Sequence, residues 1–319
     1  MDTPDREDLQ IISRHSNISQ PSMQAALKEF VHSGKRSWQQ FLRLFFLSLG
    51  IGFAASGVIF FFAYNWDYLH KFVKLGIMEG LVIILTVMAV LNKFKGILKG
   101  FLLTAASIMV GVLFAVFGQV YQTGADAYDL FLNWTICITL WTIVAGFAPL
   151  WLIWIALVNI TVQLFLRQQV AHAPMMLTPL LLFLINSICL VVALCLKKLS
   201  AVQAPDWFIK VLAIAAAVIA TIGLSIGVFD RPGALFSILL LLVMISYAAG
   251  IYYGYRNKSL FYIAVTCCSA IVIICAFILN AAESSAGILL TFFFVAGSIT
   301  MLIKVLLDLQ KKWNHEKSA

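Results

Sequence analysis

Long apolar runs, separated by short polar breaks, fill the sequence from Phe41 onward. A helix needs about 20 apolar residues to cross the hydrocarbon core of a bilayer, and ten of the runs are close to that length. The two runs between 131 and 166 are short and are separated only by Ala148-Pro149. They form either a tight hairpin of two helices that are barely long enough to span the membrane, or a pair that does not cross fully. The predicted spans are 41–64, 72–92, 97–118, 131–147, 149–166, 176–196, 208–229, 234–255, 260–281 and 286–306.

The composition is typical of a protein whose surface faces lipid. Hydrophobic residues make up 62% of the chain and charged residues 11%, whereas a soluble domain carries roughly 25% charged residues. We therefore predict an all-α polytopic transmembrane bundle of about ten spans with the lipid bilayer as its main partner. The basic tail carries Trp313 and is expected to anchor at the membrane interface. The expected divisions are a cytoplasmic helical cap at 1–37, a transmembrane domain at 38–306 and a basic cytoplasmic tail at 307–319.

The polar N-terminal segment carries signals for two short amphipathic helices. Thr3-Pro4 can open the first helix, and Ser19 or Ser22 can cap the second. Such a cap can dock on the membrane domain or on a partner. A DNA-reading helix-turn-helix is disfavoured, because acids and bases are mixed and no basic face stands out. The segment also lacks the basic head and early apolar core of a signal peptide, so the first span is expected to target the chain.

The basic residues predict that both termini lie on the cytoplasmic side. Lys and Arg accumulate in short cytoplasmic loops, and with ten crossings all but four of the 22 fall on the side of the termini. The net charge of +8 follows from the same asymmetry and suits anionic lipid headgroups, so we predict no nucleic-acid partner. The four bases on the opposite, outer side are Lys71, Lys74, Arg167 and Arg231.

Familiar catalytic and metal-binding motifs are missing from the sequence. The five histidines are scattered without an HExxH pair, and there is no P-loop and no GxSxG elbow. The six cysteines lie in apolar runs with no CxxC pair, where thiols behave as small hydrophobic groups. We predict no catalytic residue, no metal site and no cofactor. An intramembrane enzyme is the least favoured class, because it needs a nucleophile or paired carboxylates that the sequence does not assemble.

One acidic residue, Glu79, lies within a predicted span, about two turns from the outer end of that span. Ionisable groups are costly in a membrane and tend to face a bundle interior or a water path, so Glu79 is the leading candidate for a functional residue. Gly76 and Gly80 would let a neighbouring helix approach this face closely. In the alternative, Glu79 lies near the interface and is neutral or paired with Lys71 or Lys74.

The outer connection between the third and fourth spans holds the densest polar cluster, with two carboxylates, two amides, two phenols and no base. Asp126 and Asp129 share a face if this piece is helical, and such a face can bind a cation or an amine. The alternative is a solvated loop with interfacial tyrosines. Asn65-Trp66 lies on the same side, so the two loops can form one site. The candidate substrate-binding residues are Glu79, Gln119, Tyr121, Gln122, Asp126, Asp129, Asn65 and Trp66.

Four amide side chains lie within the spans. Interhelical hydrogen bonds of such groups stabilise a bundle by roughly 1 kcal/mol each in model peptides. We therefore expect them to hold helices together rather than to bind a ligand. They are Asn159, Gln163, Asn186 and Asn280.

Three features stand together in the first half of the chain: a small cap before a Gly-rich first helix (49–57), the Asn65-Trp66 pair, and Gly118-Gln119-x-Tyr121 leading through Asp126 to Trp134. In this combination the chain resembles a family of bacterial predicted membrane proteins, domain of unknown function 2157 (DUF2157). The resemblance covers about the first half and implies a bacterial inner-membrane location. It implies no activity, substrate or catalytic residue, because the family brings none.

Two hypotheses for the function follow. In the first, the protein handles a small solute or cation at its outer-facing polar site in a transporter-like way, since acidic and amide groups cluster there against an otherwise apolar bundle. In the second, it is a structural or assembly subunit that packs against another membrane protein or a second copy of itself. That packing would use its small-residue helix faces and its cytoplasmic cap.

Overall fold

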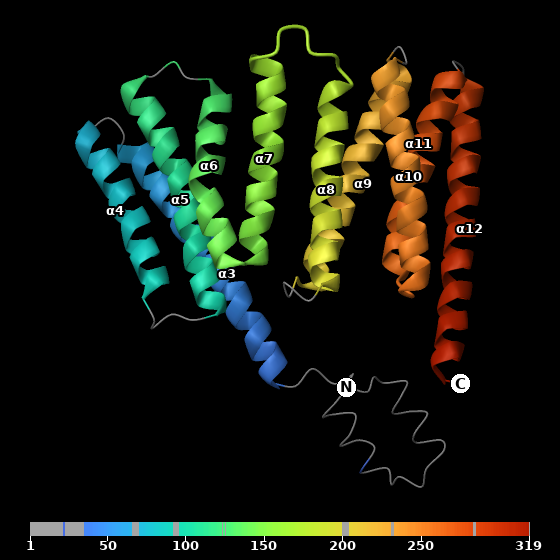
Figure 1. Ribbon diagram of the computed structural model, residues 1–319, viewed down its shortest axis with the longest axis horizontal. Coiled ribbons are helices and arrows are strands. Elements are labelled where there is room, and N and C mark those ends of the chain that lie inside the picture. The colour runs from blue at the N-terminus through green and yellow to red at the C-terminus, as the bar shows by residue number, and fades with distance from the viewer. Residues whose placement is uncertain are drawn as a thin grey trace.

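The computed structural model of the protein is all-helical in the part of the chain that it describes (Figure 1). The predicted cap at 1–37 lies outside the described residues, apart from Ser22 and the first turn of the first long helix. The described residues are Ser22, 35–65, 70–91, 96–122, 124, 126–199, 204–230, 233–282 and 285–318.

Ten helices in this described part are long and apolar enough to cross a membrane. This confirms the all-α membrane class and the prediction of about ten spans, one for each apolar run. The helices are α3 (Lys35–Asn65), α4 (Lys71–Val90), α5 (Ile97–Tyr121), α6 (Ala127–Ala145), α7 (Ala148–Gln168), α8 (Leu177–Lys198), α9 (Asp206–Phe229), α10 (Ala234–Arg256), α11 (Leu260–Ala281) and α12 (Ser285–Ser318).

Residues 131–166, where the prediction left two readings open, form two helices of spanning length. α6 has 19 residues and α7 has 21. Gly146 ends α6 with φ at 54°, in the left-handed region that favours glycine, and its N–H donates to the Thr142 carbonyl. Pro149 lies in the first turn of α7, where a missing N–H leaves no hydrogen bond unmade. The tight-hairpin reading is therefore the one that the structure supports.

Successive helices run in alternating directions between the two ends of the bundle (Figure 1). α3 begins and α12 ends at the same end of the bundle, as an even number of crossings requires. We call this end the terminal face and the opposite end the far face. The connection between α7 and α8, residues 169–176, lies at the far face (Figure 1). The assignment of the terminal face to the cytoplasm stays a prediction.

The chain packs as two groups of five helices. In the first group, α3, α4, α6 and α7 all contact α5. In the second group, α8, α10 and α11 contact α9, and α12 packs on α11. α7 joins the groups, since it contacts both α8 and α9. The place where two groups of helices meet is a common location of binding sites in membrane transporters.

Close approach within the first group depends on a glycine of α5. Gly111 lies against the indole ring of Trp134 on α6, so that a methyl group added there would come within 2.4 Å of the ring. The Trp134 Nε1–H donates to the Ser107 carbonyl at 2.8 Å. The ring thus packs on the α5 backbone and satisfies its polar atom in the same contact.

A hydroxyl cluster joins three helices of the second group. Ser269 of α11 forms hydrogen bonds with Thr221 of α9 and with Tyr247 of α10. Thr221 also donates to the Ala217 carbonyl at 2.7 Å. Because lipid offers no competing hydrogen bonds, such contacts help to hold membrane helices together.

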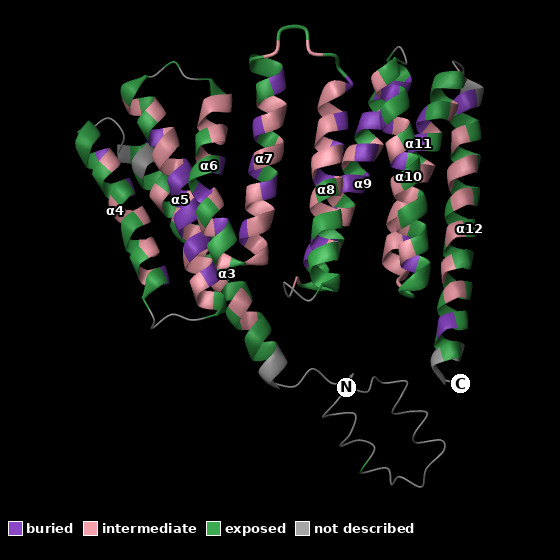
Figure 2. Cartoon of the chain, viewed as in Figure 1, coloured by how far each residue is buried: buried purple, intermediate pink, exposed green. Residues whose placement is uncertain are grey.

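The outermost helices bury almost nothing against the rest of the described chain. The most apolar windows of α3 and α12 have no buried residue, and Figure 2 shows the middle of α12 in the colours of exposed and intermediate residues. In water, exposed apolar surface costs about 25 cal/mol per Å². A bilayer removes this cost by covering the surface with lipid chains.

The C-terminal tail is docked on the neighbouring helices. α12 continues beyond its span, and the Trp313 side chain is buried with its ring centroid 6.1 Å from that of Tyr255 on α10. Lys258, after α10, forms an ion pair with Glu316 at 2.9 Å. The position of the tail at the membrane interface stays a prediction, but the Trp313 ring is not free to anchor it in lipid. The ring finds an apolar partner within the protein instead.

Candidate functional site

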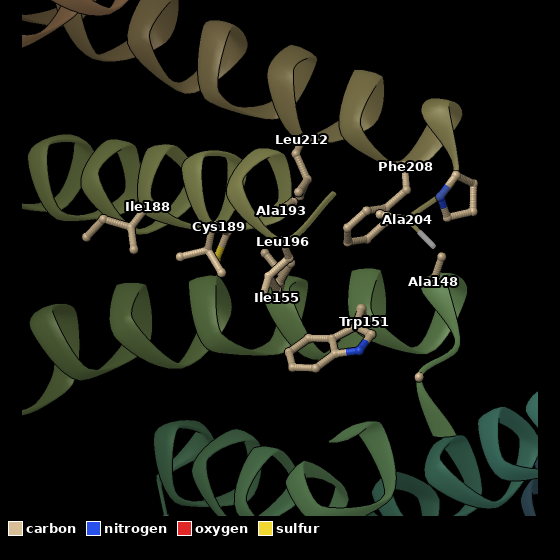
Figure 3. Close-up of a pocket in the computed structure, with 13 residues that line it drawn as sticks. Ala148, Trp151, Ile155, Ile188, Cys189, Ala193, Leu196, Ala204, Phe208 and Leu212 are labelled. Atoms are coloured by element: carbon tan, nitrogen blue, oxygen red, sulfur yellow. The ribbon is translucent and has the colours of Figure 1, made fainter. Parts of the chain in front are cut away.

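Two cavities lie along the contact between α7, α8 and α9, which we call the seam. The far cavity, of about 670 Å³, lies toward the far face and is lined by residues 163–182 and by Ile219, Ile222 and Ile226 of α9. The terminal cavity, of about 220 Å³, lies toward the terminal face (Figure 3). Since α7 joins the two groups of helices, both cavities lie where the groups meet.

A ridge of residues spaced by four runs along α7 from one cavity to the other. Trp151 and Ile155 line the terminal cavity, and Gln163 and Arg167 line the far cavity. Asn159 lies midway, about 6 Å along the helix from Ile155 and from Gln163. Residues with this spacing form a continuous ridge on a helix surface. The ridge therefore changes from apolar to polar at Asn159.

Asn159 is hydrogen-bonded to Asn186 of α8 between the two cavities. The Asn186 Nδ2 donates to the Asn159 Oδ1 at 2.6 Å, and the reciprocal contact measures 3.5 Å. Each amide also donates within its own helix, to the carbonyls of Ile155 and Leu182. Asn186 is only 2% exposed. This Asn pair confirms that both amides join helices, and its positions on α7 and α8 fall between the residues that line the far cavity and those that line the terminal one.

The ionisable side chains that line the far cavity are basic. Arg167, in the last turn of α7, and His172, in the connection to α8, both line it, and no carboxylate does. Among the described residues, no carboxylate lies within ion-pair distance of the Arg167 guanidinium. His172 has φ at 61°, which turns the connection sharply at this point. Gln163 and Thr178 add hydrogen-bonding groups to the wall. The cavity is suited to an anionic group.

The terminal cavity is apolar. Figure 3 shows Trp151 and Ile155 of α7 facing Cys189 and its neighbours on α8, with Phe208 of α9 closing the cavity. None of the lining residues is charged. At this end of the seam, Lys197 of α8 forms an ion pair with Asp206 at the start of α9. A charged group would find no polar partner inside this cavity.

Glu79 lies on the exposed side of α4, away from the seam. Its carboxylate forms no hydrogen bond or ion pair with any described residue. A Cβ atom added at Gly76 or Gly80 would meet nothing within 4 Å. The close helix approach expected at these glycines is therefore not made within the described chain. Glu79 faces the surroundings of the protein at the depth of a membrane span.

The segment from Gln119 to Asp129 is tied to the far end of α7. Asp126 accepts a hydrogen bond from the Gln169 Nε2 at 2.8 Å, and the Tyr128 N–H donates to the Gln168 Oε1 at 2.9 Å. Asp129 lies in the first turn of α6 and its N–H donates to the Asp126 carbonyl, so the two acids share one turn. The structure thus brings Asp126 to the segment that follows Arg167.

The other predicted site residues are not brought together in the described structure. Gln119, Tyr121 and Gln122 are exposed at the end of α5. Asn65 ends α3, and its side chain and the whole of Trp66 lie outside the described residues. No group of three or more potential metal ligands occurs in the described ranges.

Sequence reasoning did not select Arg167 or His172 as site residues. Arg167 carried one available signal, since it is one of four bases predicted on the side that membrane proteins keep poor in positive charge. His172 carried none, because a histidine in a connection between spans is commonplace. The cavity that joins them depends on how α8 and α9 pack against α7.

The model of the family DUF2157, described as predicted membrane proteins, matches residues 14–151. This confirms the resemblance in the N-terminal half, from before α3 to the first turn of α7. The match contains Glu79 and the Gln119 to Asp129 segment, while almost all of the seam lies beyond it. Comparisons with curated proteins and with solved structures give no match to the chain.

Proposed function

We propose that the protein binds a small solute in the far cavity and passes it along the seam, in the manner of a transporter. The observation that carries this proposal is the pair of cavities at the junction of two five-helix groups, with a hydrogen-bonded Asn pair at a level between them. In transporters that are built from two structural repeats, substrates bind near the membrane midplane where the repeats meet, and access alternates between the two sides. The Asn159–Asn186 contact is the natural place for a gate.

The proposal places the protein in a bacterial inner membrane with both termini in the cytoplasm. The distribution of basic residues supports this orientation, and the far cavity would then open to the outside. Asp126 accepts a hydrogen bond from Gln169, which lies in sequence between the lining residues Arg167 and Val170. Its role would be to hold the α5–α6 connection in place, or to attract a positively charged part of the solute.

Thiol labelling tests whether the seam opens. The test chain keeps Cys189 of the terminal cavity and replaces the other five cysteines by Ala; a membrane-impermeant methanethiosulfonate is then added to each side of sealed vesicles. We expect the Cys189 thiol to react from the far-face side, and to react faster when Asn186→Ala breaks the Asn pair. A chain with its single thiol at Val191→Cys, exposed on α8 toward lipid, is the unreactive control. A Cys189 thiol that resists the reagent from the far-face side in both chains would overturn the proposal.

The alternative function, a structural or assembly subunit, is favoured by α3. Its span buries no residue in the described chain, and a shallow groove along it is lined by Ser48, Gly52 and Ser56. Small residues spaced by four allow two membrane helices to approach closely. If the purified protein keeps a partner or a second copy in mild detergent, and Gly52→Ile but not Phe46→Ile releases it, this function is supported over transport.

A further inference from the structure

The walls of the far cavity are divided into a basic rim and an apolar interior. Arg167 and His172 lie nearest the far face, at the end of α7 and in the connection that follows it. Ile219, Ile222 and Ile226 form the α9 wall of the cavity. This wall extends about 10 Å along the helix toward the membrane interior. The cavity therefore has a charged end near the far face and an apolar end deeper in the membrane.

The rim is chemically suited to phosphate. A guanidinium presents N–H groups that match two phosphate oxygens, and charge-assisted bonds of this kind are stronger than neutral ones. Arg167 has no carboxylate partner among the described residues, so its donors need not be released from a protein partner before a ligand binds. The absence of carboxylates from the lining also disfavours a cation, which would be repelled by Arg167.

The interior is suited to a hydrocarbon chain. Ile222, within the span of α9, is 54% exposed although it lines the cavity, so the cavity is open sideways toward lipid. A volume of about 670 Å³ is in the range of cavities that hold molecules larger than a simple ion. A free anion would leave the isoleucine wall unused, whereas a lipid would bury part of a chain against it.

We infer that the far cavity binds an anionic membrane lipid, with its phosphate on Arg167 and His172 and the upper part of a chain on the isoleucines of α9. This rests on the proposed function, since it names the class of solute that the seam would receive. The lipid enters sideways from the leaflet at the far face. The Asn pair lies below the isoleucine wall and ends the site.

Lipid binding to the full chain tests the inference. The purified protein in a nonionic detergent is titrated with short-chain phosphatidylglycerol and, separately, with phosphatidylcholine of the same chain length, and bound lipid is counted by native mass spectrometry. We expect phosphatidylglycerol to bind more tightly. Arg167→Gln should weaken it by about tenfold or more, as for the loss of a charge-assisted hydrogen bond, while Arg167→Lys keeps part of the affinity. Lys71→Gln, which removes an exposed charge at the far end of α4, is the matched control.

Two further arms separate the sources of phosphate and the two ends of the cavity. Inorganic phosphate should not displace the lipid at millimolar concentration. Ile222→Asn should weaken lipid binding, because it places an amide in the apolar wall. Ile214 is exposed elsewhere on α9, so Ile214→Asn should leave lipid binding unchanged. Displacement by inorganic phosphate at that concentration, or equal losses in Arg167→Gln and Lys71→Gln, would overturn the lipid assignment.

The result is independent of the thiol-labelling test. If Cys189 reacts from the far-face side but phosphatidylglycerol shows no preference, the lipid assignment fails and solute movement stands. If the lipid binds through Arg167 but Cys189 never reacts, the protein binds lipid without passing it along the seam.

Discussion

The side-chain Nδ2 of Asn186 on α8 donates a hydrogen bond of 2.6 Å to the side-chain Oδ1 of Asn159 on α7. This contact crosses the junction between the two groups of helices, where α7 makes the packing contacts with α8 and α9. It also lies between a cavity with a basic rim and a cavity with apolar walls. One pair of amides thus joins the two groups of helices at a level between the two cavities.

Removing one member of the Asn pair should destabilise the protein more than removing both. We expect Asn186→Leu to lower the free energy of unfolding by about 1 kcal/mol, because Asn159 then loses its interhelical partner. The double variant with Asn159→Leu should be no less stable than the single one. Reversible unfolding in mixed micelles measures both. Asn280→Leu, exposed on α11, should change little; an equal loss in this control would show that the pair contributes no coupling.

A methyl group at Gly111 should disturb the contact between α5 and α6. Gly111→Ala places a Cβ within 2.4 Å of the Trp134 ring, and relieving such overpacking costs about 1–3 kcal/mol. Thermal unfolding in detergent should therefore occur at a lower temperature. Gly118→Ala on the same helix meets nothing within 4 Å and serves as the control. If the two variants unfold at the same temperature, the Gly111–Trp134 contact does not contribute to stability.

The docking of the C-terminal tail should weaken slightly in acid. The hydrogen bond and charge of Lys258 lower the pKa of the Glu316 carboxyl below its usual 4.5, with a smaller contribution from Lys312. A lowered pKa means that the ionised carboxylate favours the docked tail at neutral pH. This contribution disappears as the pH falls through the lowered pKa.

A nitroxide spin label attached to a cysteine at position 310 (Gln310→Cys), in a chain without other cysteines, reports how firmly the tail is docked. Its mobility should rise slightly as the pH falls below about 4.5, and Glu316→Gln should give the same small increase already at neutral pH with no further change in acid, because an exposed ion pair contributes little while Trp313 stays buried. A transition near pH 6.5, where histidines titrate, would assign the effect to another group.

The orientation in the membrane can be measured directly. The excess of Lys and Arg on the side of the termini predicts that a green fluorescent protein fused after Ala319 will fluoresce, since it folds in the cytoplasm. Alkaline phosphatase inserted after His172, in the α7–α8 connection, should be active because it reaches the oxidising side. The reverse pattern would contradict the assignment of the far face to the outside.

Several local features could be predicted before any packing was known. The break at Ala148-Pro149 indicated a short turn between two runs, and the structure has Pro149 in the first turn of α7. The spacing of Asp126 and Asp129 predicted one shared face, and the two acids do lie in one turn. Glu79 was selected because an acid within a span is costly. That argument identifies an unusual residue but gives no information on which side of α4 it occupies.

Sequence by itself predicted about ten spans and their approximate positions, because the bilayer imposes a minimum length of apolar residues that can be counted along the chain. It also determined the expected orientation, because charge bias between loops is a one-dimensional property. The functional seam was decided only by tertiary structure. Asn159 and Asn186 are separated by 27 positions, and Arg167 meets the isoleucines of α9 only when three helices pack together. Helix length follows from local composition, but helix contacts depend on the shapes of distant surfaces.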